Sequence, residues 1–375
     1  MILFEQEKSQ VTAPNASIKV IGVGGAGGNT VNSMIDSDLH DIEFIVANTD
    51  AQALSTSKAK ERIQLGLKST KGLGTGANPE LGKRAAEEDL DKILELVQGA
   101  DIVFVTGGLG GGTGSGALPV IARALKEKNI LCIAVVTKPF EFEGKRRAHV
   151  AEEALEKLKK EIDTLIVIPN QKLLEVVDSN VSMIDAFNMI NGVLHRSVKS
   201  ISDIIKKPGH INVDFADVRA IMKDRGLAIM GAGIATGINR AQEAAQQAIN
   251  SPLLENMTIA GAQGVLLNIS GGTNLGLHEI RIVASIIHEQ AHPDANIILG
   301  SVIDESLNDE LCVTLIATGF NQVQPQVEQE IATPLKRTAS IAKSITLENK
   351  EAIDFEDLDV PTFMRQKKEN EQENL

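Results

Sequence analysis

Short apolar runs alternate with amphipathic stretches through most of this 375-residue chain. The runs are rich in β-branched residues, as in 101–105 and 130–136, and this pattern predicts buried strands. Between the runs, apolar residues recur at steps of three and four, which predicts helices that cover a sheet. The predicted strands span 17–23, 44–47, 101–105, 130–136, 165–168, 227–230, 265–270, 296–303 and 312–318, and the predicted shorter helices span 30–37, 80–97, 117–128, 239–249 and 277–292.

The order of these elements predicts the fold class. Strands that alternate with helices form a parallel sheet with helices on both faces, and ligands bind in loops at the carboxyl ends of the strands. We therefore expect a doubly wound, Rossmann-like α/β domain over 17–180 and a second α/β domain over 208–320.

One predicted helix is much longer than the others. From 181 to 206 the apolar residues form a single stripe of about seven turns, and Pro208-Gly209 ends it. We expect this helix, 181–207, to connect the two domains, with its start near the ligand loops and with His195 in a structural role. The stripe consists of Ile184, Phe187, Ile190, Leu194, Val198, Ile201 and Ile205.

The two ends of the chain differ in composition from its middle. Residues 1–16 mix polar and apolar residues and contain proline, which predicts a loose N-terminal arm. After Phe320 the composition turns to Gln, Glu, Lys and Thr without a period, which predicts a disordered linker over 321–353. Residues 354–375 form a separate C-terminal peptide, which begins with apolar residues between acids.

Composition and charge exclude several classes of function. The net charge of −13 and the pI of about 5.1 argue against a nucleic-acid partner, because phosphate neutralisation needs clustered Lys and Arg. No apolar run approaches the ~20 residues of a membrane span, so we expect no direct membrane insertion. Cys132 and Cys312 lie in separate apolar runs, and we expect both to be reduced core thiols of a cytoplasmic protein.

The richest glycine segment is 106–116, Thr-Gly-Gly-Leu-Gly-Gly-Gly-Thr-Gly-Ser-Gly, between a predicted strand and a predicted helix. Glycine lets backbone N–H groups approach an anion closely, and the start of a helix favours phosphate. Thr113 and Ser115 add hydroxyl donors there. The loop contains no Lys, so it is not of the Walker type. We interpret it as a phosphate-binding loop.

A second glycine segment leaves an alternative open. Gly22, Gly24 and Gly27 fit G-x-G-x-x-G, and Asp50 follows about twenty residues later, which is also the fingerprint of a Rossmann-type dinucleotide-dependent oxidoreductase. That alternative does not explain the richer loop at Gly107, and the chain has no Tyr for catalysis. A single phosphate tail contacted by both loops explains the two together.

Two further loops have both a structural and a functional interpretation. In the segment 71–79, the structural interpretation is a turn in which Asn78 caps the following helix and Pro79 is its first residue. The functional interpretation is a loop whose backbone N–H groups close over a terminal phosphate. Glu143 and Arg147 either hold ribose hydroxyls or form the solvated start of a charged helix.

Asp214 and Asp217 stand three apart at a predicted helix start, so their carboxylates share one face. They serve either as first-turn residues, with Asp214 as the cap, or to orient water for attack on a γ-phosphate. The long helix separates them from the glycine loops. One chain therefore cannot join the two, whereas a second copy stacked head to tail can.

Three histidines, His278, His288 and His292, lie on or near one predicted helix. Without a third ligand at metal spacing we expect surface histidines rather than a metal site.

Six motifs occur in the order found in the tubulin/FtsZ family of GTPases, and over about 17–320 the chain resembles the bacterial cell-division branch of that family. The motifs are Gly-Val-Gly-Gly-Ala-Gly-Gly-Asn (22–29), Ala-Asn-Thr-Asp (47–50), Lys-Gly-Leu-Gly-Thr-Gly-Ala-Asn-Pro (71–79), Gly-Gly-Gly-Thr-Gly-Ser-Gly (110–116), Phe-Glu-Gly-Lys-Arg-Arg (142–147) and Asn-Val-Asp-Phe-Ala-Asp-Val-Arg (212–219). Ser115 and Gly192 are small departures from the family pattern.

The resemblance implies a tubulin-like fold and a GTPase that binds GTP or GDP, with Mg²⁺ held mainly by the phosphates. It implies a homopolymer of head-to-tail filaments that forms the cytokinetic ring, with hydrolysis at the interface between subunits and Asn212, Asp214 and Asp217 entering the neighbour's site. The implied phosphate-binding residues are Gly25, Ala26, Gly27, Gly28, Asn29, Gly112, Thr113 and Gly114. The resemblance implies that Glu143 and Arg147 bind the ribose and that Phe187 and Asn191 contact guanine. Further implied nucleotide-binding residues are Asn48, Asp50, Gly74, Ala77, Gly110, Gly111, Ser115, Thr137, Pro139 and Asn170.

The start of the C-terminal peptide resembles the family's segment that binds membrane-tethering division adaptors such as FtsA or ZipA, and division regulators. Segments that order on binding suit this role. The resemblance implies a cytoplasmic protein that assembles at mid-cell on the inner face of the membrane. The expected anchors are Leu358, Val360, Pro361, Phe363 and Met364.

Overall fold

Ten strands of the described residues form one sheet. The computed structural model describes residues 16–37, 39, 41–174, 181–207, 211, 213–254 and 259–320. The order across the sheet is β3-β2-β1-β4-β5-β6-β7-β10-β8-β9. The strands are β1 (Ile18–Val23), β2 (Ile42–Asn48), β3 (Glu61–Gln64), β4 (Ile102–Gly108), β5 (Leu131–Lys138), β6 (Thr164–Pro169), β7 (Gly226–Ala235), β8 (Gly264–Gly271), β9 (Asn296–Ile303) and β10 (Leu311–Thr318).

The sheet is parallel except at β10, which runs antiparallel to both β7 and β8. Because β1 lies beside β4, and β4 beside β5, the loops after these strands meet at the same end of the sheet. β6 pairs with β7 from Thr164↔Gly226 to Ile166↔Ala228, so one sheet continues from the first predicted domain into the second. The predicted doubly wound α/β fold is confirmed.

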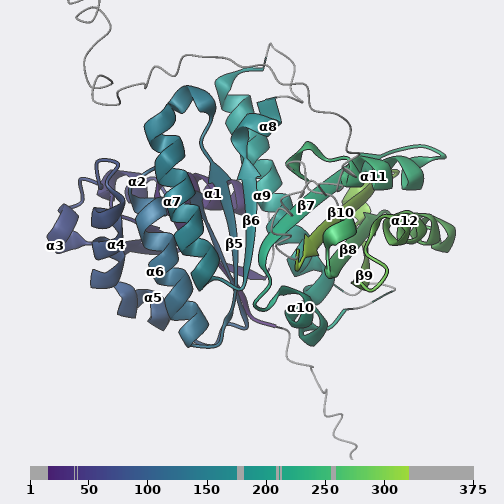
Figure 1. Cartoon of the computed structure of the whole chain (residues 1–375), viewed down its shortest axis with the longest axis horizontal. Helices are drawn as coiled ribbons and strands as arrows, with labels where there is room; N and C mark the ends of the chain where they lie inside the picture. Colours follow the sequence, from purple (N-terminus) through teal and green to yellow (C-terminus); the bar gives the residue numbers. More distant parts are fainter. Residues whose placement is uncertain are drawn as a thin grey trace, which may run out of the picture. The chain divides into compact units, whose positions relative to one another are not determined.

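Helices cover both faces of this sheet (Figure 1). One apolar cluster joins α1, α9 and α10 to one face, a second joins α4, α5, α6 and α7 to the other, and a third packs α11 and α12 on β7, β8 and β10. The helices are α1 (Gly24–Asp36), α2 (Ala51–Ser55), α3 (Leu67–Thr70), α4 (Pro79–Glu88), α5 (Leu90–Leu96), α6 (Thr113–Glu127), α7 (Lys145–Glu161), α8 (Asn170–Leu174), α9 (Met183–Lys206), α10 (Phe215–Met222), α11 (Arg240–Ile249) and α12 (Leu277–Gln290).

The long helix α9 spans 24 residues and packs on strands of both predicted domains. Its middle and end are buried in the cluster that contains Ile133 of β5 and Leu266 of β8. Its first turns are open, since the side chains of Ile184 and Phe187 are 74% and 40% exposed. The apolar stripe therefore has a packed part and a free part.

His195 of α9 is half-buried. Burial, and then the charges of Lys199 and Arg196, lower its pKa from 6.5 to about 4. The ring is neutral at pH 7, as a structural histidine inside the protein should be.

The predicted helix 80–97 is wrong as a single element, because it is divided into α4 and α5 at Asp89. The buried carboxylate of Asp89 accepts a hydrogen bond from the N–H of Gly66 at 2.7 Å and pairs with Lys92 at 2.6 Å. These contacts hold Asp89 with a ψ of 20°, outside helical geometry. A distant loop thus interrupts a locally continuous pattern.

Other boundaries also differ from the sequence prediction. α1 begins at Gly24, inside the glycine segment, and α6 begins at Thr113, four residues earlier than predicted, so it includes Gly114 and Gly116. Only the charged start of α7 was among the sequence interpretations; its buried residues Ala151, Ala154 and Leu158 recur at the helical steps of three and four. Of the two cysteines, Cys132 is buried as expected and Cys312 is only half-buried; both are free thiols.

Residues 1–15 and 321–375, which contain most of the N-terminal arm, the linker and the C-terminal peptide, lie outside the described residues. Among those described, no helix is long and apolar enough to cross a membrane.

Candidate functional site

The starts of two helices open into one cavity of about 500 Å³. α1 begins directly after β1 and α6 begins in the glycine loop after β4, and neither helix has a side-chain cap on its first N–H groups. Two uncapped helix starts that face one space form a strong anion site, because both the free N–H groups and the helix dipoles favour negative charge. The volume lies within the usual range for a small-molecule site.

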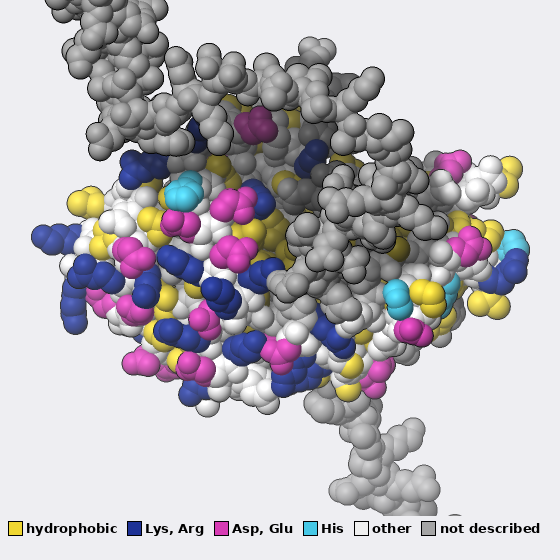
Figure 2. Space-filling model, in the orientation of Figure 1, with side chains coloured by type: hydrophobic (Ala, Val, Ile, Leu, Met, Phe, Trp, Pro, Cys, Tyr) yellow, Lys and Arg dark blue, Asp and Glu magenta, His cyan; other side chains and the backbone are white. Residues whose placement is uncertain are grey.

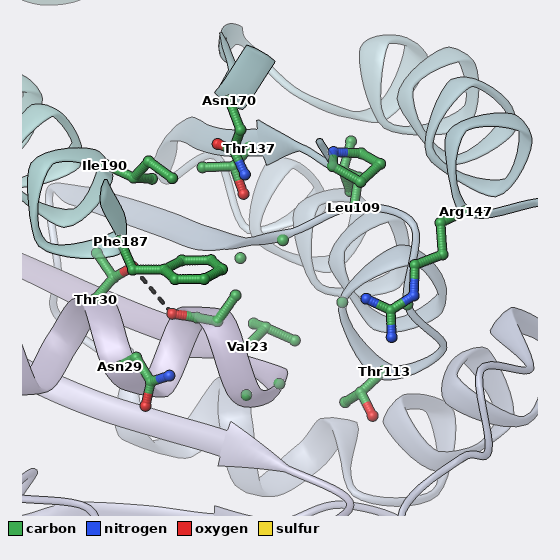
Figure 3. Close-up of a pocket in the computed structure, with 18 of the residues that line it drawn as sticks. Val23, Asn29, Thr30, Leu109, Thr113, Thr137, Arg147, Asn170, Phe187 and Ile190 are labelled. Carbon is green, nitrogen blue, oxygen red and sulfur yellow. Dashed lines mark hydrogen bonds between the residues drawn. The ribbon is translucent and has the colours of Figure 1, made fainter. Parts of the chain in front are cut away.

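The residues that line the cavity come from the first predicted domain, 17–180, and from α9. They are Val23, Gly24, Gly25, Ala26, Asn29, Thr30, Thr75, Gly107, Gly108, Leu109, Gly111, Gly112, Thr113, Gly114, Thr137, Pro139, Glu143, Arg147, Asn170, Phe187, Ile190, Asn191 and Leu194. Figure 3 shows Phe187 and Arg147 reaching toward the glycines from opposite sides.

Some glycines of the two loops bring backbone close to backbone, and others leave open space. A Cβ on Gly27 would lie 2.5 Å from the carbonyl oxygen of Thr106, and a Cβ on Gly114 would lie 2.4 Å from that of Gly108. A Cβ on Gly25 or Gly111 would meet nothing within 4 Å. The first pair holds the helices against the sheet, while the second pair borders the cavity.

Three hydroxyl groups gather at the start of α6. The Thr113 and Thr49 hydroxyl oxygens are 2.7 Å apart, and those of Thr113 and Thr75 are 3.4 Å apart. The hydroxyl of Ser115 instead accepts a hydrogen bond from the N–H of Gly110 at 2.9 Å, in the buried interior. Ser115 therefore closes the loop, whereas Thr113 and Thr75 line the cavity.

Another part of the cavity combines apolar side chains with two amides. Phe187 and Ile190 of α9 line it beside the buried side chain of Asn170. The Oδ1 atom of Asn170 has no hydrogen-bond partner among the described residues, so a buried acceptor is left for a ligand. The Thr30 hydroxyl donates to Oδ1 of Asn191 at 3.2 Å, which fixes the orientation of that amide.

Glu143 and Arg147 lie one turn apart at the side of the cavity. The Arg147 Nη1 atom is 2.5 Å from Glu143 Oε2, and Oε1 of Glu143 accepts from the N–H of Phe140 at 2.9 Å. The carboxylate is held at both oxygens, and Arg147 remains half-exposed. The pair can present hydroxyl-binding groups in a fixed geometry.

Several expected ligand residues lie near the cavity without lining it. Asp50 caps α2 by accepting from the N–H groups of Gln52 and Ala53, at 2.9 and 3.2 Å. In an oxidoreductase of the Rossmann type this carboxylate would bind ribose, so its use as a cap disfavours that alternative. The other expected residues outside the lining are Gly27, Gly28, Asn48, Gly74, Ala77, Gly110 and Ser115.

Sequence reasoning missed some lining residues. Thr75 stands between two glycines of the 71–79 loop, which was a usable signal. Ile190 and Leu194 were assigned only to the packed stripe of α9, because their helical spacing does not show which of them border a cavity. Thr30 and Leu109 also line the cavity and were not singled out.

Asp214 and Asp217 lie away from this cavity. Both are exposed, and Asp214 is the N-cap of α10, since its Oδ1 accepts from the N–H of Asp217 at 2.8 Å. The Arg219 guanidinium of α10 donates to the carbonyl of Asn129, just before β5, whereas the cavity lies beyond the end of β5. β5 has 8 residues, about 26 Å at ~3.3 Å per residue. Asn212 lies outside the described residues.

Within the described ranges there is no group of three or more His, Cys, Asp or Glu side chains that could hold a metal ion.

An open α/β sheet with two glycine loops and two helix starts around one cavity defines a nucleotide-binding protein. Residues 17–178 match the model of the tubulin/FtsZ family GTPase domain, and residues 226–321 match that of the FtsZ family C-terminal domain. The chain belongs to the tubulin/FtsZ family of GTPases, and within it to the FtsZ type.

Solved structures agree with this assignment. An FtsZ dimer of M. jannaschii, described as empty, is 44% identical, with a TM-score of 0.78 over 82% of this chain and 89% of its own. CetZ2 of Haloferax volcanii, described as a GTPγS-bound protofilament, shares the fold at 22% identity, with a TM-score of 0.69 over 82% of this chain and 94% of its own. The expected family is confirmed, whereas a bacterial source stays a prediction.

Proposed function

We propose that the chain polymerises head to tail and hydrolyses GTP at the contact between subunits. In this proposal the glycine loops at the starts of α1 and α6 hold the phosphates. Glu143 and Arg147 hold the ribose, and Phe187 packs against guanine with Asn170 and Asn191 at its edge. The unpartnered Oδ1 of Asn170 and the open space at Gly25 and Gly111 fit such a ligand.

Mg²⁺, in the same proposal, is held mainly by the phosphates. The lining of the cavity, as far as the structure describes it, contains one carboxylate, Glu143, and both its oxygens are already engaged. The Thr113 and Thr49 hydroxyls offer additional oxygen atoms near the start of α6. Bound Mg²⁺ would neutralise charge that develops on the phosphates during transfer.

The observation that carries the proposal is the separation of binding groups from carboxylates. The cavity supplies donors for phosphate but no free carboxylate to orient a water molecule, among the residues described. Asp214 and Asp217 are exposed, on the helix that packs at the opposite end of the strands. A second subunit stacked on the cavity would bring this pair, with Asn212, to the γ-phosphate, and positioning and electrostatics would then drive hydrolysis.

The same proposal extends to the cell. Filaments of this chain would form the cytokinetic ring at mid-cell, on the inner face of the membrane, and the C-terminal peptide would bind tethering adaptors. Removal of 354–368 should leave GTP hydrolysis intact and abolish adaptor binding in a pull-down. Adaptor binding that survives this deletion would contradict the assigned role.

The direct test of the shared site mixes two inactive variants. Asp217→Asn keeps the cavity and loses a carboxylate, whereas Gly25→Asp keeps the Asp pair and places negative charge where phosphate binds, in open space that avoids a clash. Each variant alone should hydrolyse GTP at least tenfold more slowly than the wild type. The mixture should recover a clear part of the rate, because each Gly25→Asp subunit completes the site of an Asp217→Asn neighbour. A mixture no faster than its components would contradict the proposal.

A further inference from the structure

The turn after α6 contains Asn129 at a position where glycine is more usual. α6 ends in a Schellman motif, in which the N–H of Asn129 donates to the carbonyl of Lys126 at 2.9 Å and the N–H of Ile130 donates to that of Leu125 at 3.2 Å. Asn129 has a φ of 58°, in the left-handed region. Glycine adopts this conformation without the cost of a Cβ, so the backbone alone does not account for an asparagine here.

The side chain of Asn129 binds the helix that carries the aspartate pair. Its Oδ1 atom accepts hydrogen bonds from Nη2 of Arg219 at 2.9 Å and from Nζ of Lys223 at 3.2 Å. The carbonyl of Asn129 accepts from the same Arg219 nitrogen at 3.2 Å. The Arg219 guanidinium also lies 5.9 Å from the ring centre of Phe215, the first residue of α10. Three hydrogen bonds therefore join α10 to the turn that ends α6.

Arg219 and Asp217 lie on opposite flanks of the buried face of α10. Val218, Ile221 and Met222 are the buried residues of this helix. At 3.6 residues per turn, Asp217 and Arg219 are about 200° apart around the helix axis. Asp217 is exposed and Arg219 is half-buried. A contact that holds the flank of Arg219 therefore restricts the roll of α10, and with it the direction of the Asp217 carboxylate.

A small roll of α10 would affect chemistry more than folding. For a side-chain end ~5 Å from the helix axis, a roll of about 10° is a displacement of about 1 Å. A misplacement of this size can lower a reaction rate by about 10²-fold. The three hydrogen bonds are exposed, and Figure 2 shows Lys and Arg side chains next to Asp and Glu along the lower edge of the molecule, where Figure 1 places α10. Loss of a contact at such a surface should cost little stability.

Other contacts keep α10 attached when Asn129 is changed. Nζ of Lys126 lies 2.7 Å from Oδ1 of Asp224, two residues after α10, and this hydrogen bond lowers the pKa of Asp224. The N–H of Asp224 donates to the buried carboxylate of Asp163, just before β6, at 3.4 Å. These contacts hold the end of α10, whereas Asn129 holds its flank.

We propose that Asn129 is a positioning residue for GTP hydrolysis. By binding Arg219 and Lys223 it sets the direction in which Asp217 is presented to the neighbouring subunit. This role rests on the proposed function, in which the aspartate pair completes the site of the next subunit. Asn129 acts only through α10, and its own side chain takes no part in nucleotide binding.

The test is Asn129→Gly, which removes the Oδ1 acceptor at a backbone conformation that glycine prefers. We expect at least a fivefold lower rate of GTP hydrolysis per polymerised subunit, with polymer measured by sedimentation above the assembly threshold. The affinity for a fluorescent GDP analogue should stay within twofold of the wild type. The midpoint of thermal unfolding should not fall by more than about 2 °C. A purely structural role would instead lower the midpoint and the rate together.

A conservative variant and a matched control accompany this test. Asn129→Asp keeps an acceptor oxygen and tolerates the left-handed region, so it should retain at least half of the rate. Asn308→Gly changes the same residue type at another exposed position of positive φ, 48°, whose hydrogen bonds go to Glu305 and Ser306. It should hydrolyse GTP at the wild-type rate. The double variant Asn129→Gly/Arg219→Ala should be no slower than the slower single variant, because both substitutions remove the same contact.

Mixing experiments separate a failure of this role from a failure of the proposed function. Asn129→Gly should gain rate when mixed with Gly25→Asp, whose α10 is intact, but not when mixed with Asp217→Asn. If Asp217→Asn and Gly25→Asp do not complement each other, the proposed function is wrong and the role of Asn129 falls with it. If they do, the role alone is overturned by a wild-type rate in Asn129→Gly, by loss of its polymer or its nucleotide affinity, or by equal recovery with Asp217→Asn.

Discussion

At the scale of the residue, a glycine without a side chain lets the helices next to the glycine segment 106–116 pack closely. Gly116 lies in α6 where a Cβ would be 2.0 Å from the carbonyl oxygen of Pro79 and 2.5 Å from the N–H nitrogen of Lys83. Alanine has the better helix propensity by about 1 kcal/mol, yet these neighbours are backbone atoms that cannot move aside locally. The two helices that carry the loops can approach only without that Cβ.

Gly116→Ala should therefore destabilise the protein by about 1–3 kcal/mol through overpacking, measured by urea unfolding without nucleotide. The control is Gly111→Ala in the same loop, where a Cβ would meet nothing within 4 Å and φ is not positive. It should change the free energy of unfolding by less than about 0.5 kcal/mol. Equal effects of the two substitutions would contradict the packing argument.

At the scale of the element, α9 is attached at its far end by a small charge network. Lys199 Nζ lies 2.9 Å from Asp304 Oδ2 and 3.7 Å from Asp203 Oδ2, and Lys207 is 3.1 Å from Asp203. Burial alone would raise the pKa of Asp304, but hydrogen bonds from Ser306 and Lys199 outweigh it and lower the pKa from 3.8 to about 2. The ionised form of Asp304 thus stabilises the junction between α9 and the end of β9.

Asp304→Asn should lower the free energy of unfolding by about 2 kcal/mol at pH 7, since one pKa unit corresponds to ~1.4 kcal/mol. The folded pKa is below the unfolded one, so this contribution is complete above about pH 4 and is lost as the pH falls toward 2. The difference between wild type and variant, followed by urea unfolding from pH 7 to pH 3, should shrink accordingly. Asp294→Asn, with a side chain 94% exposed, is the control and should have little effect at any pH. A difference that does not depend on pH would rule out the charge of Asp304 as the cause.

At the scale of the whole molecule, the cavity and the aspartate pair lie at opposite ends of the strands. The cavity lies beyond the carboxyl ends of β1, β4 and β5, and α10 with its aspartates packs near the start of β5. Under the proposed mechanism, a single subunit therefore lacks part of its catalytic site, and hydrolysis requires assembly.

GTP hydrolysis per subunit should therefore depend on protein concentration. We expect a rate near zero at high dilution that rises above a threshold, together with light scattering recorded in parallel. Gly25→Asp is the control for nucleotide dependence and should show neither signal. A constant rate per subunit from the most dilute sample upward would mean that the site is complete in one chain.

The sequence alone was sufficient to predict features of the structure that depend on a few neighbouring residues. The capping role of Asn78 with Pro79 at the first helical position and the N-cap Asp214 were structural interpretations of the sequence and are confirmed, because a cap depends on a few consecutive residues. The strand pattern was also local, since a buried parallel strand is a short apolar run. Asn78, for example, accepts from the N–H groups of Glu80 and Leu81, as its position before Pro79 predicts.

Other features depend on contacts between residues far apart in the sequence, and only the tertiary structure decided them. The break at Asp89 requires Gly66. The exposure of Phe187 but not of Val198 depends on the sheet beneath α9. Local pattern specifies which residues face the same side of an element, but not what occupies that side. The sequence therefore determined most of the strands and helices and the family, whereas only the packed sheet decided which side chains border the cavity and that the aspartate pair lies far from it.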